Sequence, residues 1–186
     1  MSRLFAFAAT TSGEWRISSI RGIVGESLPP ASHLQVRAAP ESPARESPAW
    51  VLRGITSNER YITRSEKDQL VAVQEGLGRP GSGCAALIPI RKSAVWWALS
   101  QDERRAIFEE HSKHVKVGLM HLPPVARRLH HCRDISADEP FDFLTWFEYA
   151  PAYEEGFNAL VADLRASEEW KYVDREVDIR LIRDEA

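Results

Sequence analysis

The sequence predicts an α+β fold in which one antiparallel, ferredoxin-like sheet carries helices on one face. Two observations support this prediction. After residue 50, strand-like and helix-like segments follow in the order strand, helix, strand, helical insertion, strand, helix, strand. The 186 residues also fit one compact domain, or one domain with a partial second one, and 44% of them are hydrophobic, which is enough for a core.

The first fifty residues contain short strand patterns and a proline-rich connector. The strand patterns cover residues 3–9, 14–23 and 33–38. The segment PESPARESP, residues 40–48, is polar and rich in proline, which is typical of a connector. We therefore expect residues 1–49 to form a truncated N-terminal ferredoxin-like half with its connector, and residues 50–186 to form the main domain.

The patterns after the connector are sharper. They predict strands over residues 50–56, 84–91, 141–149 and 173–182. They predict helices over residues 63–76, 100–117 and 151–166, and a short helix from the proline pair at 123–124 to residue 129. The second strand, residues 84–91, is apolar enough to be buried on both faces. Ser100 and Glu103 form a capping-box pattern that opens the second helix.

Charge and composition exclude several classes of protein. The net charge is −3 and no long Lys/Arg block is present, so a nucleic-acid partner is not expected. No apolar run approaches the roughly 18 residues that span a membrane. The N-terminal residues are a poor signal peptide, which favours a cytoplasmic protein. Cys84 and Cys132 lie in no CxxC pair and are expected to be buried, reduced thiols.

Five of the six histidines lie in the helical insertion, namely His111, His114, His121, His130 and His131. Zinc spacings such as CxxC or HExxH do not occur among them. His111 and His114 share a helix whose inward stripe is apolar. A histidine there must have both ring nitrogens satisfied, and an iron ion on one and a carboxylate on the other would do so. Ordinary core or surface histidines are the alternative.

Aromatic and cationic residues flank this insertion. Trp96 and Trp97 are core residues or, beside a flat macrocycle, a pocket wall. Lys92 is a solvated lysine or the partner of a propionate at the pocket mouth. Arg127 and Arg128 are surface residues by default, but in a dry pocket an arginine offers several donors to a small anion.

Five segments together resemble the chlorite dismutases, in a short form with a truncated N-terminal half. The segments are residues 52–63, 87–118, 125–135, 141–149 and 168–181. The resemblance implies a fold of the dimeric α/β-barrel type, haem b as the cofactor and a homodimer as the assembly. It also implies an enzyme that converts the small anion chlorite to chloride and molecular oxygen.

The resemblance further implies the roles of individual residues. The family's iron-ligating histidine lies thirteen residues before its distal arginine, which selects His114 as the metal ligand and Arg127 as the catalytic residue. Glu168 matches the glutamate that bonds the histidine's other nitrogen, with Glu169 as the alternative. The remaining implied contacts to the cofactor are Lys92, Trp96, Trp97, Asn58, Tyr61 and Gln74.

Two other functions are compatible with parts of the sequence. A coproheme decarboxylase would share the fold, but its distal position usually lacks an arginine like Arg127, and the N-terminal half is short here. A non-catalytic α+β dimerisation module would explain the strands but not the histidine helix, the tryptophan pair and the arginine together. A Soret absorption band separates the module from the two haem proteins, and oxygen release from chlorite separates those two.

Overall fold

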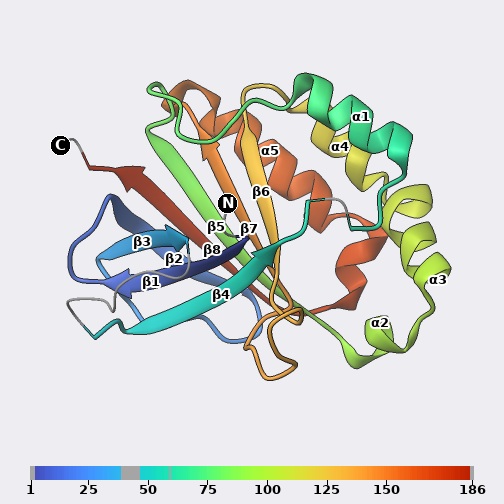
Figure 1. The fold of residues 1–186 in the computed structure, drawn as a ribbon, viewed down its shortest axis with the longest axis horizontal. Coiled ribbons are helices and arrows are strands. Elements are labelled where there is room, and N and C mark those ends of the chain that lie inside the picture. Colours follow the sequence, from blue (N-terminus) through green and yellow to red (C-terminus); the bar gives the residue numbers. More distant parts are fainter. Residues whose placement is uncertain (1–2, 39–46, 59, 185–186) are drawn as a thin grey trace.

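In the described part of the chain, eight antiparallel strands close into a barrel, and the helices lie outside it on one side (Figure 1). The structure is a computed structural model, and it describes residues 3–38, 47–58 and 60–184. The strands are β1 (Leu4–Thr10), β2 (Trp15–Val24), β3 (His33–Ala38), β4 (Trp50–Thr56), β5 (Cys84–Lys92), β6 (Ala126–His131), β7 (Phe143–Tyr149) and β8 (Val173–Arg183). Their order around the barrel is β1-β3-β2-β8-β5-β7-β6-β4.

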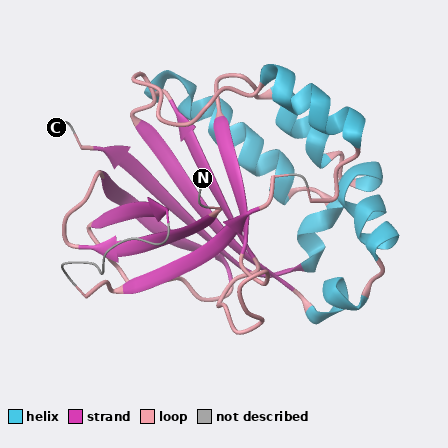
Figure 2. Ribbon diagram, in the orientation of Figure 1, coloured by secondary structure: helices cyan, strands magenta, loops and turns pink. Residues whose placement is uncertain are grey.

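The helical segments are short and mostly lie between β5 and β6 or between β7 and β8 (Figure 2). They are α1 (Arg64–Val73), α2 (Ala94–Ala98), α3 (Gln101–Arg105), the π-helix η1 (Ala106–His111), α4 (His114–Met120), the 3₁₀ turns η2 (Pro151–Tyr153) and η3 (Glu168–Tyr172), and α5 (Glu154–Arg165). Complete capping boxes begin α1 at Thr63 and α3 at Ser100, because each hydroxyl accepts the backbone N–H three residues on.

The predicted fold class is wrong, because the sheet is a closed barrel and not an open ferredoxin-like sheet with helices on one face. β1 pairs with β3 on one side and with β4 on the other, while β2 pairs with β8. The three N-terminal strands thus join the two edges that an open sheet would leave free. Closure satisfies the backbone groups of those edges and removes a site for aggregation.

The β5 strand shows how the sheet separates two cores. Ala85 and Leu87 point into the barrel, where they pack with rings such as Phe7 and Trp146. Ala86, Ile88 and Ile90 point outward and belong to a second core that packs against α5. This explains why the segment looks buried on both faces in the sequence: side chains alternate between the faces, and each face meets apolar neighbours.

Two local predictions are wrong, and a third concerns residues that the structure mostly does not describe. The short helix expected up to residue 129 is instead the strand β6. The helix expected over residues 100–117 is broken into α3, η1 and α4, with Lys113 at a positive φ of 52° between the last two. Most of the connector at residues 40–48 lies outside the described residues. Within the described part of the chain, no helix has the length and apolarity required to cross a membrane.

Candidate functional site

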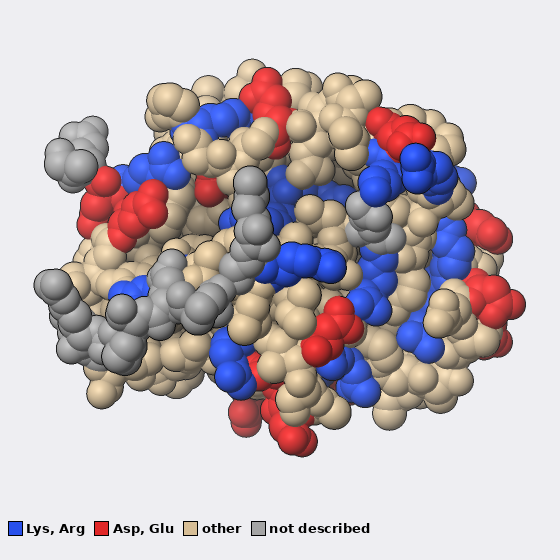
Figure 3. All heavy atoms as spheres, in the orientation of Figure 1, with Lys and Arg blue, Asp and Glu red and all other residues tan. Residues whose placement is uncertain are grey.

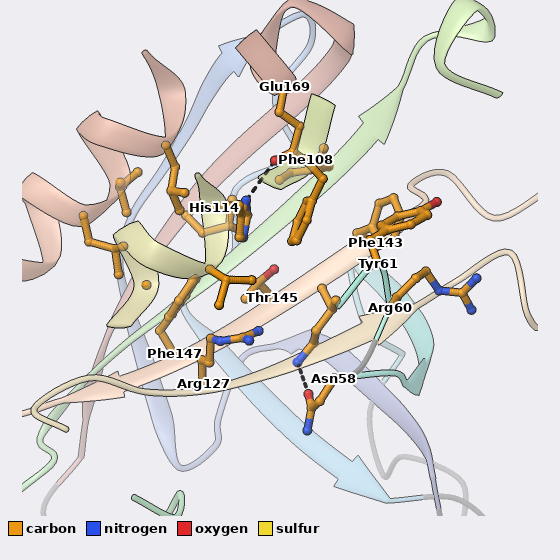
Figure 4. Close-up of a pocket in the computed structure, with 18 of the residues that line it drawn as sticks. Asn58, Arg60, Tyr61, Phe108, His114, Arg127, Phe143, Thr145, Phe147 and Glu169 are labelled. Carbon is orange, nitrogen blue, oxygen red and sulfur yellow. Dashed lines mark hydrogen bonds and ion pairs between the residues drawn. The ribbon is translucent and has the colours of Figure 1, made fainter. Parts of the chain in front are cut away.

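A cavity lies between the outward face of the sheet and the helices that cover it (Figure 4). Its empty space, including the part open to solvent, is about 1200 Å³. Alternate residues of the three adjacent strands β5, β7 and β6 form its floor, namely Ile88 and Ile90, Phe143, Thr145 and Phe147, and Arg127 and Leu129. Period-two alternation therefore selects which strand residues face the cavity.

His114 is the first residue of α4 and lines the cavity. Its Nδ1–H donates a 2.8 Å hydrogen bond to Oε2 of Glu169. The ring of Phe108 stacks on the imidazole with 4.3 Å between the ring centroids. Among the described residues Nε2 has no protein partner, so the ring is oriented by one nitrogen and leaves the other for a ligand. His111 differs, because its side chain is 53% exposed.

Glu169 is buried between Lys92 and His114. Its Oε1 accepts a 2.7 Å hydrogen bond from the Lys92 ammonium, while Oε2 accepts from His114. Burial by itself would raise the pKa of the Glu169 carboxyl, but the charges and hydrogen bonds of Lys92 and His114 lower it to about 2. The carboxylate is therefore ionised at neutral pH and gives the imidazole a strong acceptor.

Lys92, Glu169 and His114 form a hydrogen-bonded triad. The structure changes two sequence predictions about the residues around it. Glu168, chosen as the partner of His114, instead lies 3.7 Å from His111, and the alternative, Glu169, makes the bond. Lys92, expected to meet a propionate at a pocket mouth, lines the cavity but is only 5% exposed and is ion-paired with Glu169. In a 3₁₀ turn adjacent side chains point in different directions, and spacing alone does not say which of two neighbouring glutamates faces inward.

Arg127 lies on β6 and lines the cavity from the side opposite His114 (Figure 4). Among the described residues its guanidinium makes no hydrogen bond or ion pair, and burial lowers its pKa below the ordinary value. Arginine nevertheless stays charged in proteins, so the group is a cation without a counter-ion in the described part of the chain. Arg128, the next residue along the strand, points the other way and packs 4.1 Å over the ring of Phe5.

The other predicted contacts divide into residues that line the cavity and residues behind it. Asn58, Tyr61 and Trp96 line it. Tyr61 has a positive φ of 64°, a strained conformation for a bulky residue, and its ring meets Trp96 edge-on at 5.9 Å. Trp97 and Gln74 are not among the lining residues. The Trp97 indole donates to Asp142 at 3.2 Å, and the Gln74 amide donates to the backbone carbonyl of Arg127 at 2.7 Å.

Several lining residues were not singled out in the sequence as site residues, among them Arg60, Thr145 and Phe147. Thr145 and Phe147 could have been found from strand alternation once the outward face was known. Arg60 is bound in two hydrogen bonds by Asp134, a partner 74 residues away that no local pattern indicates. Lysine and arginine side chains are spread over the helix-bearing part of the face seen in Figure 3, with acidic groups along its margin.

The residues around the cavity fit a haem group. The walls are mainly apolar and aromatic. One imidazole nitrogen of His114 has no partner among the described residues, and the other is hydrogen-bonded to a carboxylate. Axial ligation by a histidine whose second nitrogen is hydrogen-bonded is a common way to hold haem iron. The uncommitted Arg127 cation on the other side suits a small anion.

The comparisons with known proteins all indicate the same family. A family model described as chlorite dismutase matches residues 41–183. The chlorite dismutase of Ideonella dechloratans is 31% identical over 123 residues, which are 65% of this chain and 40% of that protein. The chain thus spans about two fifths of the length of this curated relative.

Solved structures give the same result. The dimeric chlorite dismutase of Nitrobacter winogradskyi is 55% identical, with a TM-score of 0.88 over 97% of this chain and 99% of that one. The chlorite dismutase of Candidatus Nitrospira defluvii in complex with imidazole is 28% identical, with a TM-score of 0.57 over 82% of this chain and 57% of that one. A mutant of the latter enzyme, 20% identical with a TM-score of 0.66, supports the fold alone.

Proposed function

The chain belongs to the chlorite dismutase family, and we propose that it is a haem b-dependent enzyme that converts chlorite to chloride and molecular oxygen. The observation that supports this most directly is the Arg127 guanidinium. It faces the same cavity as His114 and has no counter-ion among the described residues. A cation that faces the cavity without a counter-ion can bind a small oxyanion such as chlorite by charge-assisted hydrogen bonds.

His114 would hold the haem iron through Nε2, because Nδ1 is committed to Glu169. Glu169, kept ionised by Lys92, would draw the Nδ1 proton toward itself and give the ring partial imidazolate character. Trp96 and Tyr61 would pack against the macrocycle as parts of the cavity wall. When bound, haem b would supply the redox-active iron at which chlorite is cleaved.

Arg127 would bind chlorite and then retain the hypochlorite formed from it. Both are small oxyanions, and the guanidinium can donate several hydrogen bonds from one side of the cavity. Retention would keep hypochlorite inside the cavity and prevent the escape of a reactive oxidant into solution. Gln74 would assist indirectly, since its amide holds the backbone carbonyl of Arg127 and so fixes the position of β6 at this residue.

The function is tested with haem-loaded protein and chlorite in an oxygen electrode. We expect a Soret band in the purified or reconstituted protein and rapid oxygen release when chlorite is added. His114→Ala should lose stable haem binding, while His111→Ala, a matched change at an exposed histidine of the same region, should keep it. A Soret band without oxygen release would reject the activity, and a normal haem spectrum in His114→Ala would reject the proposed iron ligand.

Removal of the distal cation should change the fate of hypochlorite and leave the cofactor in place. Arg127→Ala is expected to bind haem normally but to lose hypochlorite to solution, so its Soret band should bleach several times faster during turnover. The measurement is Soret absorbance against oxygen released, with a hypochlorite trap present and absent. Unchanged turnover together with unchanged bleaching would contradict the role of Arg127.

We also propose that the protein is a homodimer. The similar structure from Nitrobacter winogradskyi is described as dimeric and covers almost all of both chains. Light scattering on the purified protein should give about twice the 21.1 kDa mass of one chain.

A further inference from the structure

Two buried side chains outside the His114–Glu169–Lys92 triad hold the turn that carries its carboxylate. The backbone N–H of Glu169 donates a 2.8 Å hydrogen bond to Oγ of Ser112. The indole N–H of the next residue, Trp170, donates a 2.7 Å hydrogen bond to Oε2 of Glu176. Ser112 is 7% exposed and Glu176 is fully buried. The two acceptors therefore hold consecutive residues of η3, one from the segment before α4 and the other from β8.

The turn η3 needs such support because it is weakly defined by itself. It is a single short 3₁₀ segment, and its N-cap, Ser167, makes no side-chain capping hydrogen bond. The Glu169 carboxylate nevertheless has to reach two partners at once, Lys92 at 2.7 Å and His114 at 2.8 Å. A small rotation of the turn would lengthen one of these bonds, so the geometry of the triad depends on what holds η3.

Each anchor is itself fixed to a larger element. Ser112 lies between η1 and α4, two residues before His114, so one short segment supports both sides of the His114–Glu169 bond. Glu176 lies on β8 and is held from α5 by Arg165, through bonds of 2.8 Å and 2.5 Å. The anchored Trp170 in turn packs beside the Lys92 ammonium, whose nitrogen lies 5.5 Å from the centroid of the indole ring.

We propose that Ser112 and Glu176 are positioning residues that fix η3 and thereby set the strength of the hydrogen bond between Glu169 and His114. Neither residue needs to touch a substrate for this role. Loss of either anchor lets the turn relax, lengthens the Glu169–His114 bond and reduces the imidazolate character of the ligand. In its effect on the iron the inference rests on the proposed haem function, but the hydrogen bond itself is a property of the protein.

The test uses Ser112→Ala and Glu176→Gln, each with a matched control. Ser167→Ala removes another hydroxyl from the same turn, one that is buried without a hydrogen-bond partner. Asp178→Asn removes the other carboxylate that binds Arg165, at 2.9 Å, and leaves the bond from Trp170 to Glu176 in place. If Glu176→Gln does not fold, Trp170→Phe removes the same bond from the donor side.

Two readouts separate this inference from the proposed activity. In haem-free protein, the Nδ1–H proton of His114 should give a downfield NMR resonance that is lost or shifted upfield in Ser112→Ala and Glu176→Gln and kept in both controls. In haem-loaded protein, the iron–histidine stretching frequency should fall in the same two variants, with haem affinity lower by roughly tenfold. Folded variants with the wild-type resonance and frequency would overturn the inference, whether or not the protein releases oxygen from chlorite.

Discussion

At the scale of single residues, strand alternation assigns neighbouring side chains to different environments. Arg127 faces the cavity, and Arg128 packs over Phe5 on the other face of β6. Glu168 and Glu169 are also neighbours in different environments. The 3₁₀ turn that contains them directs Glu168 toward His111 and Glu169 toward His114. In both pairs the two residues are chemically identical, so sequence alone gives no local signal for the choice. The resemblance to a family selects one arginine, and only the geometry of the turn selects the glutamate.

A buried histidine gives a pH prediction at this scale. Burial lowers the pKa of His130 from 6.5 to about 4, and the nearby positive charge of Arg128 adds to the effect. Below pH 6.5 the unfolded chain binds a proton that the folded protein does not. The free energy of unfolding should therefore fall as the pH decreases from about 6.5 to 4, by about 3 kcal/mol from this residue.

Urea unfolding at pH 7 and at pH 4.5 measures this contribution. In His130→Gln the pH dependence should be flatter than in the wild type by most of that amount. His111→Gln, at an exposed histidine, should keep the wild-type dependence. Parallel pH profiles for the wild type and His130→Gln would show that His130 is not the group responsible.

At the scale of elements, the predicted strands and helices mostly agree with the structure, and the exceptions have physical causes. The β6 sequence ARRLHH alternates between a cavity and a barrel interior, and its polar residues hide the apolar pattern of a strand. The π-helix η1 and the left-handed Lys113 break a helix that reads as continuous in sequence. Such breaks frequently occur at functional sites, and this one places His114 at the start of a new helix.

The contact between β4 and β6 depends on a glycine. A Cβ atom at Gly54 would lie 2.7 Å from Cβ of His130, closer than unstrained atoms approach. Gly54→Ala should therefore force the two strands apart and lower the free energy of unfolding by about 1–3 kcal/mol. Thermal and urea unfolding measure the effect. Gly81→Ala, where no atom lies within 4 Å of the new Cβ, is the control and should stay near the wild-type value. Equal midpoints for the two variants would contradict the steric argument.

At the scale of the whole molecule, the sequence predicts the number and kind of elements better than their connection. Closure depends on pairing between β1 and β4 and between β2 and β8, and the second pair joins residues about 160 positions apart. The register of such pairs follows from which face is buried, and a short N-terminal strand gives no sign of its partner. The three strands therefore look like a partial second half in sequence, although in space they complete the barrel.

The cavity residues come from separate stretches of chain that the barrel and its helices bring together. The sequence indicates His114 and Arg127 by their setting and by family resemblance, and their proposed roles await the experiments above. It does not indicate Glu176 or Ser112, because their proposed role rests on hydrogen bonds across 6 and 57 positions that leave no spacing pattern. Long-range hydrogen bonds of this kind are visible only after folding.

The two cores should respond differently to substitution. Phe7 is fully buried inside the barrel, and Phe7→Ala should lower the free energy of unfolding by about 3–5 kcal/mol. Under the proposed function, the folded fraction of this variant should show the Soret band of the haem-loaded wild type, since the cavity lies on the other face of the sheet. Val71→Ala, at a residue 70% exposed, should change stability by less than about 0.5 kcal/mol. A Soret band altered in Phe7→Ala below its unfolding temperature would show that the two faces are coupled.

Odd and even positions of β5 and β7 face different cores. Each strand sequence is therefore subject to two separate constraints, the packing of the barrel interior and the shape of the cavity. Residues that face the barrel interior can stay constant and preserve the fold, while the residues next to them in sequence can be substituted to change the shape of the cavity. Substitution of every second residue in a strand can thus change which ligands the cavity admits and leave the packing of the barrel interior intact.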